Sequence, residues 1–359
     1  MARKKKKKEP IPVDKKVEKL IEIYKDAEKK LIEIIANKKV RGNVTTFYQE
    51  MLKQVQQEIL RLQIYHTQWA TDITKQLYEQ AYKEAIEMLG ISEESLTQLH
   101  RDAIEVIADN LVNNLNQATD LVGRQIEDSI REVGLSSTAN KFATGQTIRQ
   151  MQKQLVIKLL DEGLTAIKDK RGRNISLSSY SEMLARSIVA ETQNTCVKNV
   201  MKEHNRDLVK MTEHYTSCPL CATYEGRVYS ISGNDSRFPS LQSIPGFRDG
   251  YNNIHPRCRH RISPYIEKYQ DVEKDMKNSN RPFEIDKSKE ESVNQYFAEQ
   301  KEKAKLRNDR KQYEKYKQVL GDLAPKSFAG FRRMKKSNSD NWKELQSKYR
   351  KKIKEVEEI

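Results

Sequence analysis

The chain has 359 residues and a formal net charge of +15, with 36% hydrophobic and 33% charged residues. So few apolar residues exclude one thick globular core and favour elongated helices with narrow apolar faces, arranged in two or three modules. No run approaches the roughly 18 apolar residues that a membrane helix needs, and four cysteines cannot form a disulfide framework for a chain of this size, so neither a membrane span nor a disulfide-stabilised secreted protein is expected.

The N-terminal arm, residues 1–13, is strongly basic. Such a cluster predicts contact with a polyanion such as nucleic acid, because each neutralised phosphate releases condensed counterions. Solubility, or a nonspecific basic tail, is the alternative. The arm continues into Glu9 and Pro10 and not into an apolar segment, so we expect no signal peptide. Its candidate phosphate contacts are Arg3, Lys4, Lys5, Lys6, Lys7 and Lys8.

Residues 14–170 are expected to form a long-helix domain, because their apolar side chains recur at spacings of three and four residues. Gly90 supplies a C-terminal stop for the second helix, and Ser92 is a candidate N-cap for the third. His66 and Trp69 are expected at core or interface positions. The expected helices extend over 14–38, 46–89, 92–133 and 147–160, with a Gly/Ser/Thr-rich interval at 134–145.

The polar, turn-prone stretch 168–178 predicts a module boundary, and residues 171–268 are expected to form a second domain. A helix is expected over 179–204, with Cys196 as a small buried apolar residue. Between 211 and 265 the sequence changes to turns, prolines and glycines, with one β-prone run at 227–231. The predicted fold is therefore mainly α and elongated, with a small α+β module.

Three of the four cysteines lie within this module and indicate a metal site. Cys218 and Cys221 form a CxxC turn that can deliver two sulfurs to one tetrahedral ion, and His255 and Cys258 follow as a second ligand pair. Zinc accepts both sulfur and imidazole nitrogen, so these four residues predict a Zn²⁺ site. Four protein ligands leave no position for water, so the ion would be structural and would cross-link a segment with few large apolar residues.

Alternatives to this site stay open. His260 is an alternative fourth ligand and His214 a further one, because both are close in sequence to the same cysteines. The cysteines could instead be reduced core residues, or the CxxC pair could be redox-active, although no βαβ pattern surrounds it. The extra histidines also leave a zinc-dependent nuclease open. Such an enzyme would need an acidic or histidine constellation, and its acidic candidates are only the scattered Asp235, Asp249 and Glu225.

Residues 269–359 are expected to form a basic helical segment with breaks near 278–282 and 325–330. Within 301–359, nineteen basic side chains stand against nine acidic ones. Four of them lie next to aromatic residues, which favours phosphate binding, although a solvated basic face explains the same pattern. These four residues are Arg332, Arg333, Lys335 and Lys336.

Several motifs between 180 and 265 resemble those of tailed-phage minor capsid proteins. They are Tyr180-Ser181-Glu182-Met183 with Arg186, Asp207-Leu208-Val209 before His214, Cys218-Pro219-Leu220-Cys221, Glu225-Gly226-Arg227-Val228-Tyr229-Ser230 and His255-Pro256-Arg257-Cys258-Arg259-His260. The chain is similar to the phage minor capsid protein 2 family and, more widely, to the Mu F-like minor head proteins. Some relatives have a second cysteine where this chain has His260.

The resemblance implies a non-enzymatic structural protein of the virion, made in the bacterial host cytoplasm and located in the head near the portal. It implies a part in head assembly, with the portal or major capsid proteins, packaged double-stranded DNA and further copies of the chain as partners. Two other interpretations compete with it. One is a zinc-dependent nuclease or toxin-like enzyme, and the other is a zinc-containing helical adaptor that binds proteins through its long helices.

Overall fold

The structure is a computed structural model that describes residues 13–37, 44–92, 95–143, 165–168, 172, 174–214, 216–285 and 287–357. Within these ranges the fold is mainly α, as the apolar periodicity predicts, with two small antiparallel sheets. The basic cluster at 3–8 and the helix expected at 147–160 lie outside the described residues. No described helix is long and apolar enough to cross a membrane.

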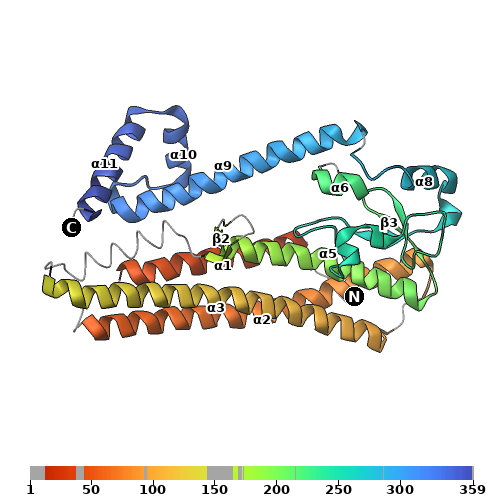
Figure 1. Ribbon diagram of the computed structural model, residues 1–359, viewed down its shortest axis with the longest axis horizontal. Coiled ribbons are helices and arrows are strands. Elements are labelled where there is room, and N and C mark those ends of the chain that lie inside the picture. The colour runs from red at the N-terminus through yellow and green to blue at the C-terminus, as the bar shows by residue number, and fades with distance from the viewer. Residues whose placement is uncertain are drawn as a thin grey trace, which may run out of the picture.

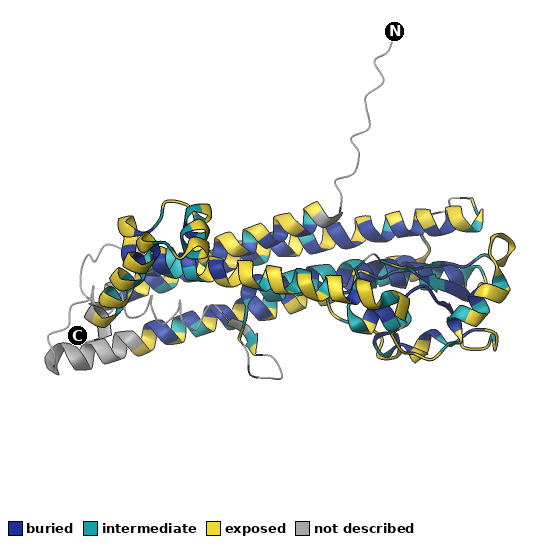
Figure 2. Ribbon diagram, turned by 90° about the horizontal axis from the view of Figure 1, so that it is seen from above, coloured by how far each residue is buried: buried dark blue, intermediate teal, exposed yellow. Residues whose placement is uncertain are grey.

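Long helices lie side by side in the described part of the chain and form an elongated bundle (Figure 1). They are α1 (Val13–Asn37), α2 (Val44–Leu89), α3 (Gln98–Ala143) and α5 (Leu177–Glu203). Helices α1, α2 and α3 each turn an apolar stripe inward, and Leu20, Leu62 and Leu115 are fully buried there. Figure 2 shows that buried residues follow the inner sides of these helices while the outer sides are exposed. With 46 residues, α2 and α3 are each about 70 Å long.

A polar layer interrupts the apolar interior of the bundle. The Nδ1 atom of His66 lies 2.7 Å from the Tyr24 hydroxyl, and its Nε2 atom lies 2.8 Å from Asn116 Oδ1. Such a layer favours one axial register, because a slip of any helix would leave buried polar groups unpaired.

The expected core positions are confirmed: His66 and Cys196 are fully buried, and Trp69 packs against the core.

The third helix differs from the prediction at both ends. Helix α3 begins at Gln98 and not at Ser92, and the hydroxyl of Thr97, just before it, donates to Glu203 of α5 at 2.7 Å. It also continues to Ala143, through the interval that the composition predicted as a break. Glycine, serine and threonine each disfavour a helix by about 1 kcal/mol or less, so they do not end one by themselves.

A second module packs on the end of α2 and α5 and contains a three-stranded antiparallel sheet in the order β4-β3-β5. Its strands are β3 (Leu208–Met211), β4 (Val228–Ser230) and β5 (Ile262–Pro264). Val209 in the central strand pairs with Tyr229 on one side and Pro264 on the other. The strand predicted at 227–231 is confirmed as β4.

Short elements complete this part of the fold. The hairpin of β1 and β2 lies close to the boundary predicted at 168–178. Helix α8 ends within the break predicted at 278–282. These elements are β1 (Thr165–Lys168), β2 (Asn174–Ser176), α6 (Pro219–Tyr224), η1 (Leu241–Ser243), α7 (Pro245–Arg248), η2 (Glu267–Tyr269), α8 (Val272–Ser279) and η3 (Lys287–Lys289).

The C-terminal segment folds around its own aromatic core. Helix α9 (Glu290–Leu320) extends along the bundle to η4 (Gly321–Leu323), α10 (Phe328–Ser337) and α11 (Asp340–Glu357) (Figure 1). Tyr316 stacks on Tyr349, and Phe331 is fully buried and packs against Tyr316 and Trp342. Helix α10 starts inside the break predicted at 325–330, because the Ser327 hydroxyl caps it by accepting from the Gly330 N–H at 3.1 Å.

Candidate metal centre

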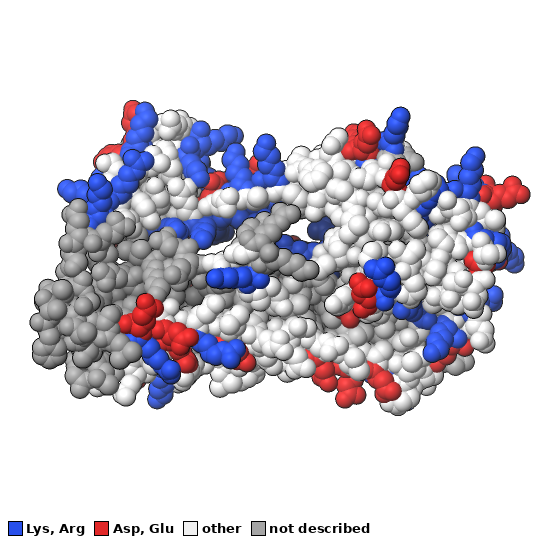
Figure 3. Space-filling model, viewed as in Figure 1, with Lys and Arg blue, Asp and Glu red and all other residues white. Residues whose placement is uncertain are grey.

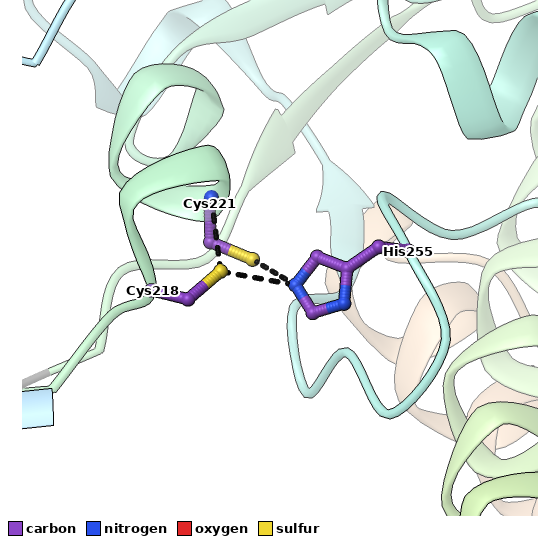
Figure 4. A group of neighbouring side chains, drawn as sticks. All are labelled: Cys218, Cys221 and His255. Carbon is purple, nitrogen blue, oxygen red and sulfur yellow. Dashed lines mark hydrogen bonds between the residues drawn. The ribbon is translucent and has the colours of Figure 1, made fainter. Parts of the chain in front are cut away.

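The start of helix α6 brings Cys218 and Cys221 together. Cys218 is the N-cap residue, and its Sγ accepts a hydrogen bond from the backbone N–H of Cys221 at 3.4 Å. Pro219 suits the first helical position, because a helix does not use the N–H that proline lacks there. One turn of chain therefore directs both sulfurs to the same side, as Figure 4 shows.

His255 completes a triad with these two thiols (Figure 4). Its Nε2 atom lies 3.1 Å from Cys218 Sγ and 3.0 Å from Cys221 Sγ. The Nδ1 atom lies 2.6 Å from the backbone oxygen of Pro256, which fits an N–H at this position and a lone pair on Nε2. Histidines that bind metals commonly have their outer nitrogen held in this way.

Cys258 and His260 form a second triad, in which Cys221 is again a member. The sulfurs of Cys221 and Cys258 are 3.7 Å apart, and Nδ1 of His260 lies 3.6 Å from Cys258 Sγ. Tetrahedral zinc places its sulfur ligands roughly 3.8 Å apart. The four ligands predicted from the sequence are therefore divided between two adjacent triads that share Cys221: His255 and Cys218 belong to the first, and Cys258 and the alternative ligand His260 to the second.

His214 belongs to neither triad. Its ring lies edge-on to the ring of His260, with centroids 4.4 Å apart, and its Nε2 atom is 3.4 Å from the Thr212 hydroxyl. The geometry thus separates His214 from the other two histidines, which each direct a ring nitrogen at a thiol.

Hydrogen bonding within the cluster shifts the pKa of every member. The bond with Cys221 lowers the pKa of Cys218 and of Cys258 to about 4 each, and the same bonds raise the pKa of Cys221. Burial lowers the pKa of His255 and His260, but their bonds to these sulfurs outweigh it and raise both to about 9. A bound cation would displace protons from this cluster, because thiols and imidazoles bind metals in their deprotonated forms.

Glu225 braces His260 from the outer side of the cluster. This carboxylate is fully buried, accepts from His260 Nε2 at 2.8 Å and from the Ser217 hydroxyl, and lies 3.0 Å from Lys289 Nζ. Burial alone would raise its pKa, but these three donors hold the pKa at about 2. The sequence analysis missed this bracing, because Lys289 is far from Glu225 along the chain.

Comparison with known proteins then identifies the family. The model of the family described as phage minor capsid protein 2 matches residues 9–353. The chain belongs to the phage minor capsid protein 2 family. It is also similar to a structural protein of Lactococcus phage LL-H, with 25% identity over 156 residues that cover 40% of this chain and 40% of that protein. No solved structure matches.

Family membership makes this minor capsid protein a structural component of a phage particle and not an enzyme. The match to the phage LL-H protein covers less than half of either chain. Of the acidic residues considered for a nuclease site, Glu225 contacts His260, whereas Asp235 and Asp249 lie outside both triads of the candidate metal centre. Asp235 pairs with Arg237 at 2.7 Å and Asp249 with Arg248 at 3.3 Å, and neither carboxylate belongs to a triad.

The four basic residues of α10 that were predicted to bind nucleic acid divide into two pairs. Arg332 Nε and Lys335 Nζ contact the buried carboxylate of Asp309 at 3.2 and 2.6 Å. Arg333 and Lys336 are exposed, and neither has an ion-pair partner among the described residues. Lys and Arg side chains project from this end of the minor capsid protein in Figure 3. The first pair therefore stabilises the C-terminal fold, and the second is available for a ligand.

Proposed function

We propose that this minor capsid protein works in the phage head near the portal, where it takes part in head assembly and contacts packaged DNA. The main support is the convergence of three cysteines and two histidines at one end of an elongated helical bundle, in a chain that belongs to a phage capsid family. The proposed modules are a basic arm (1–13), a long-helix domain (14–170), a core (171–268) with its zinc module (211–265), and a basic C-terminal segment (269–359).

The proposed cofactor is one structural Zn²⁺ ion, held by Cys218, Cys221, His255 and Cys258. Three neighbouring thiols, with an imidazole whose Nε2 faces two of them, Cys218 and Cys221, are donors that zinc prefers. A closed set of four protein ligands leaves no open position for a substrate, which agrees with a structural protein. His260 is the alternative fourth ligand, because its Nδ1 atom also faces a thiol.

Paired histidine variants decide which imidazole is the ligand. If His255 is the fourth ligand, His255→Ala lowers zinc retention during dialysis against a chelator, whereas His260→Ala retains zinc as the unmodified chain does. The reverse order would assign the position to His260. Equal retention in both variants would contradict a histidine ligand. Cobalt substitution provides a second readout, because its absorption spectrum reports the sulfur and nitrogen count.

Contact with double-stranded DNA is supported by the basic ends and by the exposed pair Arg333 and Lys336. Binding through phosphates makes the logarithm of the association constant fall linearly with the logarithm of salt concentration. We expect this dependence in fluorescence-anisotropy titrations with duplex DNA of arbitrary sequence. No binding at about 50 mM salt, a concentration at which phosphate contacts are strong, would contradict DNA contact.

Docking on another head protein or on a second copy is supported by an apolar surface on α2. Leu60 and Ile64 lie one helical turn apart, and more than half of each side chain is exposed. Cross-linking mass spectrometry of purified heads is the direct test. We expect cross-links from this chain to portal or major capsid subunits, and its absence from DNA-filled heads would contradict the proposed location.

A further inference from the structure

Three candidate metal ligands lie on one irregular loop, residues 252–262. His255, Cys258 and His260 are on this loop, which forms no helix and joins a strand only at its last residue. Asn252 and Arg257 within the loop adopt left-handed backbone conformations, with φ of 49° and 65°. Such a backbone persists only when its surroundings hold it, so the ligand positions depend on what the loop contacts.

The side chain of Asn194 on α5 holds both ends of this loop. Asn194 is fully buried, its Nδ2 atom donates to the backbone oxygen of Asn252 at 2.8 Å, and its Oδ1 atom accepts from the Ile262 N–H at 2.8 Å. An asparagine side chain carries a donor and an acceptor on one short planar group. One residue therefore fixes two loop positions that are ten residues apart in the sequence.

Other side chains of α5 hold the loop at its start and its middle. Lys198 Nζ donates to Asn252 Oδ1 at 2.7 Å, and Asn252 Nδ2 donates to the Thr195 hydroxyl at 2.9 Å. The Ser187 hydroxyl accepts from the backbone N–H of Arg257 at 2.9 Å. Helix α5 thus holds the loop at residues 252, 257 and 262, and the three candidate ligands lie between these points.

Helix α5 is also a member of the long bundle, where it packs against α1, α2 and α3. The bundle therefore determines where the loop lies relative to Cys218 and Cys221 on α6. We propose that Asn194 is a positioning residue of the metal centre, which holds His255 and Cys258 in place for the ion and joins the centre to the bundle. This proposal rests on the proposed zinc site.

Two substitutions at Asn194 test this, with a matched control on the same helix. Asn194→Ala removes both bonds, and the nearly isosteric Asn194→Asp keeps the acceptor for Ile262 but directs a second acceptor at the Asn252 oxygen. Asn199→Ala is the control, because the Asn199 amide donates to the Tyr78 hydroxyl at 2.9 Å and so supports the bundle, not the loop.

The measurement is the rate of zinc transfer from the full chain to a chromogenic chelator, at a temperature where circular dichroism shows every variant folded. We expect both Asn194 variants to release zinc roughly 10- to 100-fold faster, the range typical of lost outer-sphere support. The absorption spectrum of the Co²⁺-loaded variants should change as well. Asn199→Ala should release zinc at the rate of the unmodified chain even if its melting temperature falls.

The outcomes separate this proposal from the zinc site itself. If the unmodified chain holds zinc and the Asn194 variants match it in release rate and Co²⁺ spectrum, the positioning function is wrong and the zinc site stands. If the unmodified chain holds no zinc, both proposals fail. Should Asn194→Ala not fold, Asn194→Asp gives the same decision, because it preserves the volume of the side chain.

Discussion

Lys289, the residue before helix α9, places its Nζ atom 3.0 Å from Oε1 of Glu225, a carboxylate with no exposed surface. The other oxygen of Glu225 accepts from His260 at the edge of the thiol cluster. One helical turn further on, the Ser292 hydroxyl accepts from the backbone N–H of Ser217 at 3.0 Å. The start of α9 is thus attached to the outer side of the candidate metal centre.

Lys289→Met should destabilise the module, because it removes the cation beside the buried Glu225 carboxylate and leaves only His260 and the Ser217 hydroxyl as its partners. We expect a loss of about 2 kcal/mol in the free energy of unfolding, measured by chemical denaturation. Lys303→Met is the matched control, since Lys303 forms an exposed pair with Glu299 at 3.5 Å and should change stability by less than about 1 kcal/mol. Equal losses in the free energy of unfolding would show that the buried pair stabilises the protein no more than the exposed pair does.

The two pairs of basic residues on α10 should behave differently. Replacing Arg333 and Lys336 by alanine should weaken DNA binding and reduce its salt dependence, with the melting temperature unchanged. Replacing Arg332 and Lys335 should lower the melting temperature, because Asp309 loses both of its cationic partners. Anisotropy titrations and thermal melts of both double variants check this, and a loss of DNA affinity only in the second pair would contradict it.

His66 should make the bundle less stable in acid. Burial lowers its pKa from the ordinary 6.5, because it removes water from the charged ring, and this outweighs the opposite effect of the hydrogen bond with Asn116. As the pH falls through 6.5, the unfolded chain binds a proton that the folded chain resists, so stability is full above this pH and falls below it. The slope cannot exceed about 1.4 kcal/mol per pH unit for one group.

Urea unfolding of the unmodified chain and of His66→Gln, at pH 7.5 and 5.5, measures this contribution. The metal centre is common to both proteins and distant from His66, so its own pH dependence cancels in the difference. We expect a smaller acid-induced loss in the variant. The same loss in both proteins would mean that His66 binds a proton as readily in the folded chain as in the unfolded chain.

Gly246→Ala should disrupt the loop that carries the metal ligands. A Cβ atom at Gly246 would lie 1.9 Å from the backbone oxygen of Asn253, so the loop backbone would have to move. We expect a loss of about 3 kcal/mol in thermal or chemical unfolding. Gly123→Ala is the control in the interior of α3, where the added Cβ meets Ile59 at an ordinary 3.5 Å and should stabilise by up to about 1 kcal/mol. An unchanged stability of Gly246→Ala would contradict the close approach of Gly246 to the Asn253 backbone.

Local patterns were enough to predict the long helices, and non-local contacts explain what the sequence analysis missed. The apolar spacing of α1 and α2 lies within each helix, so their bounds agree with the prediction to within about two residues. At the start of α3, Thr97 contacts Glu203 on α5, and no local pattern reveals this contact. Strands β3 and β5 have only four and three residues, too few for a clear alternation.

In the candidate site, too, local patterns were predictable from the sequence and non-local contacts were not. Cys218 and Cys221 were predictable as ligands because the CxxC spacing corresponds to one local turn. The sequence did not decide whether His255 or His260 is the fourth ligand, because both lie within three residues of Cys258. Glu225 appeared to be an isolated acidic residue, since its partner Lys289 lies in another element. Asn194 resembled any polar helix residue, and only its two bonds to the loop distinguish it.

Native mass spectrometry of the purified full chain, before and after exposure to a chelator, tests the zinc site most directly. We predict one zinc ion per folded chain, its removal by the chelator together with a fall in melting temperature, and its absence from Cys221→Ser. A chain that holds no tightly bound metal, and whose melting temperature is the same in Cys221→Ser, would contradict the account.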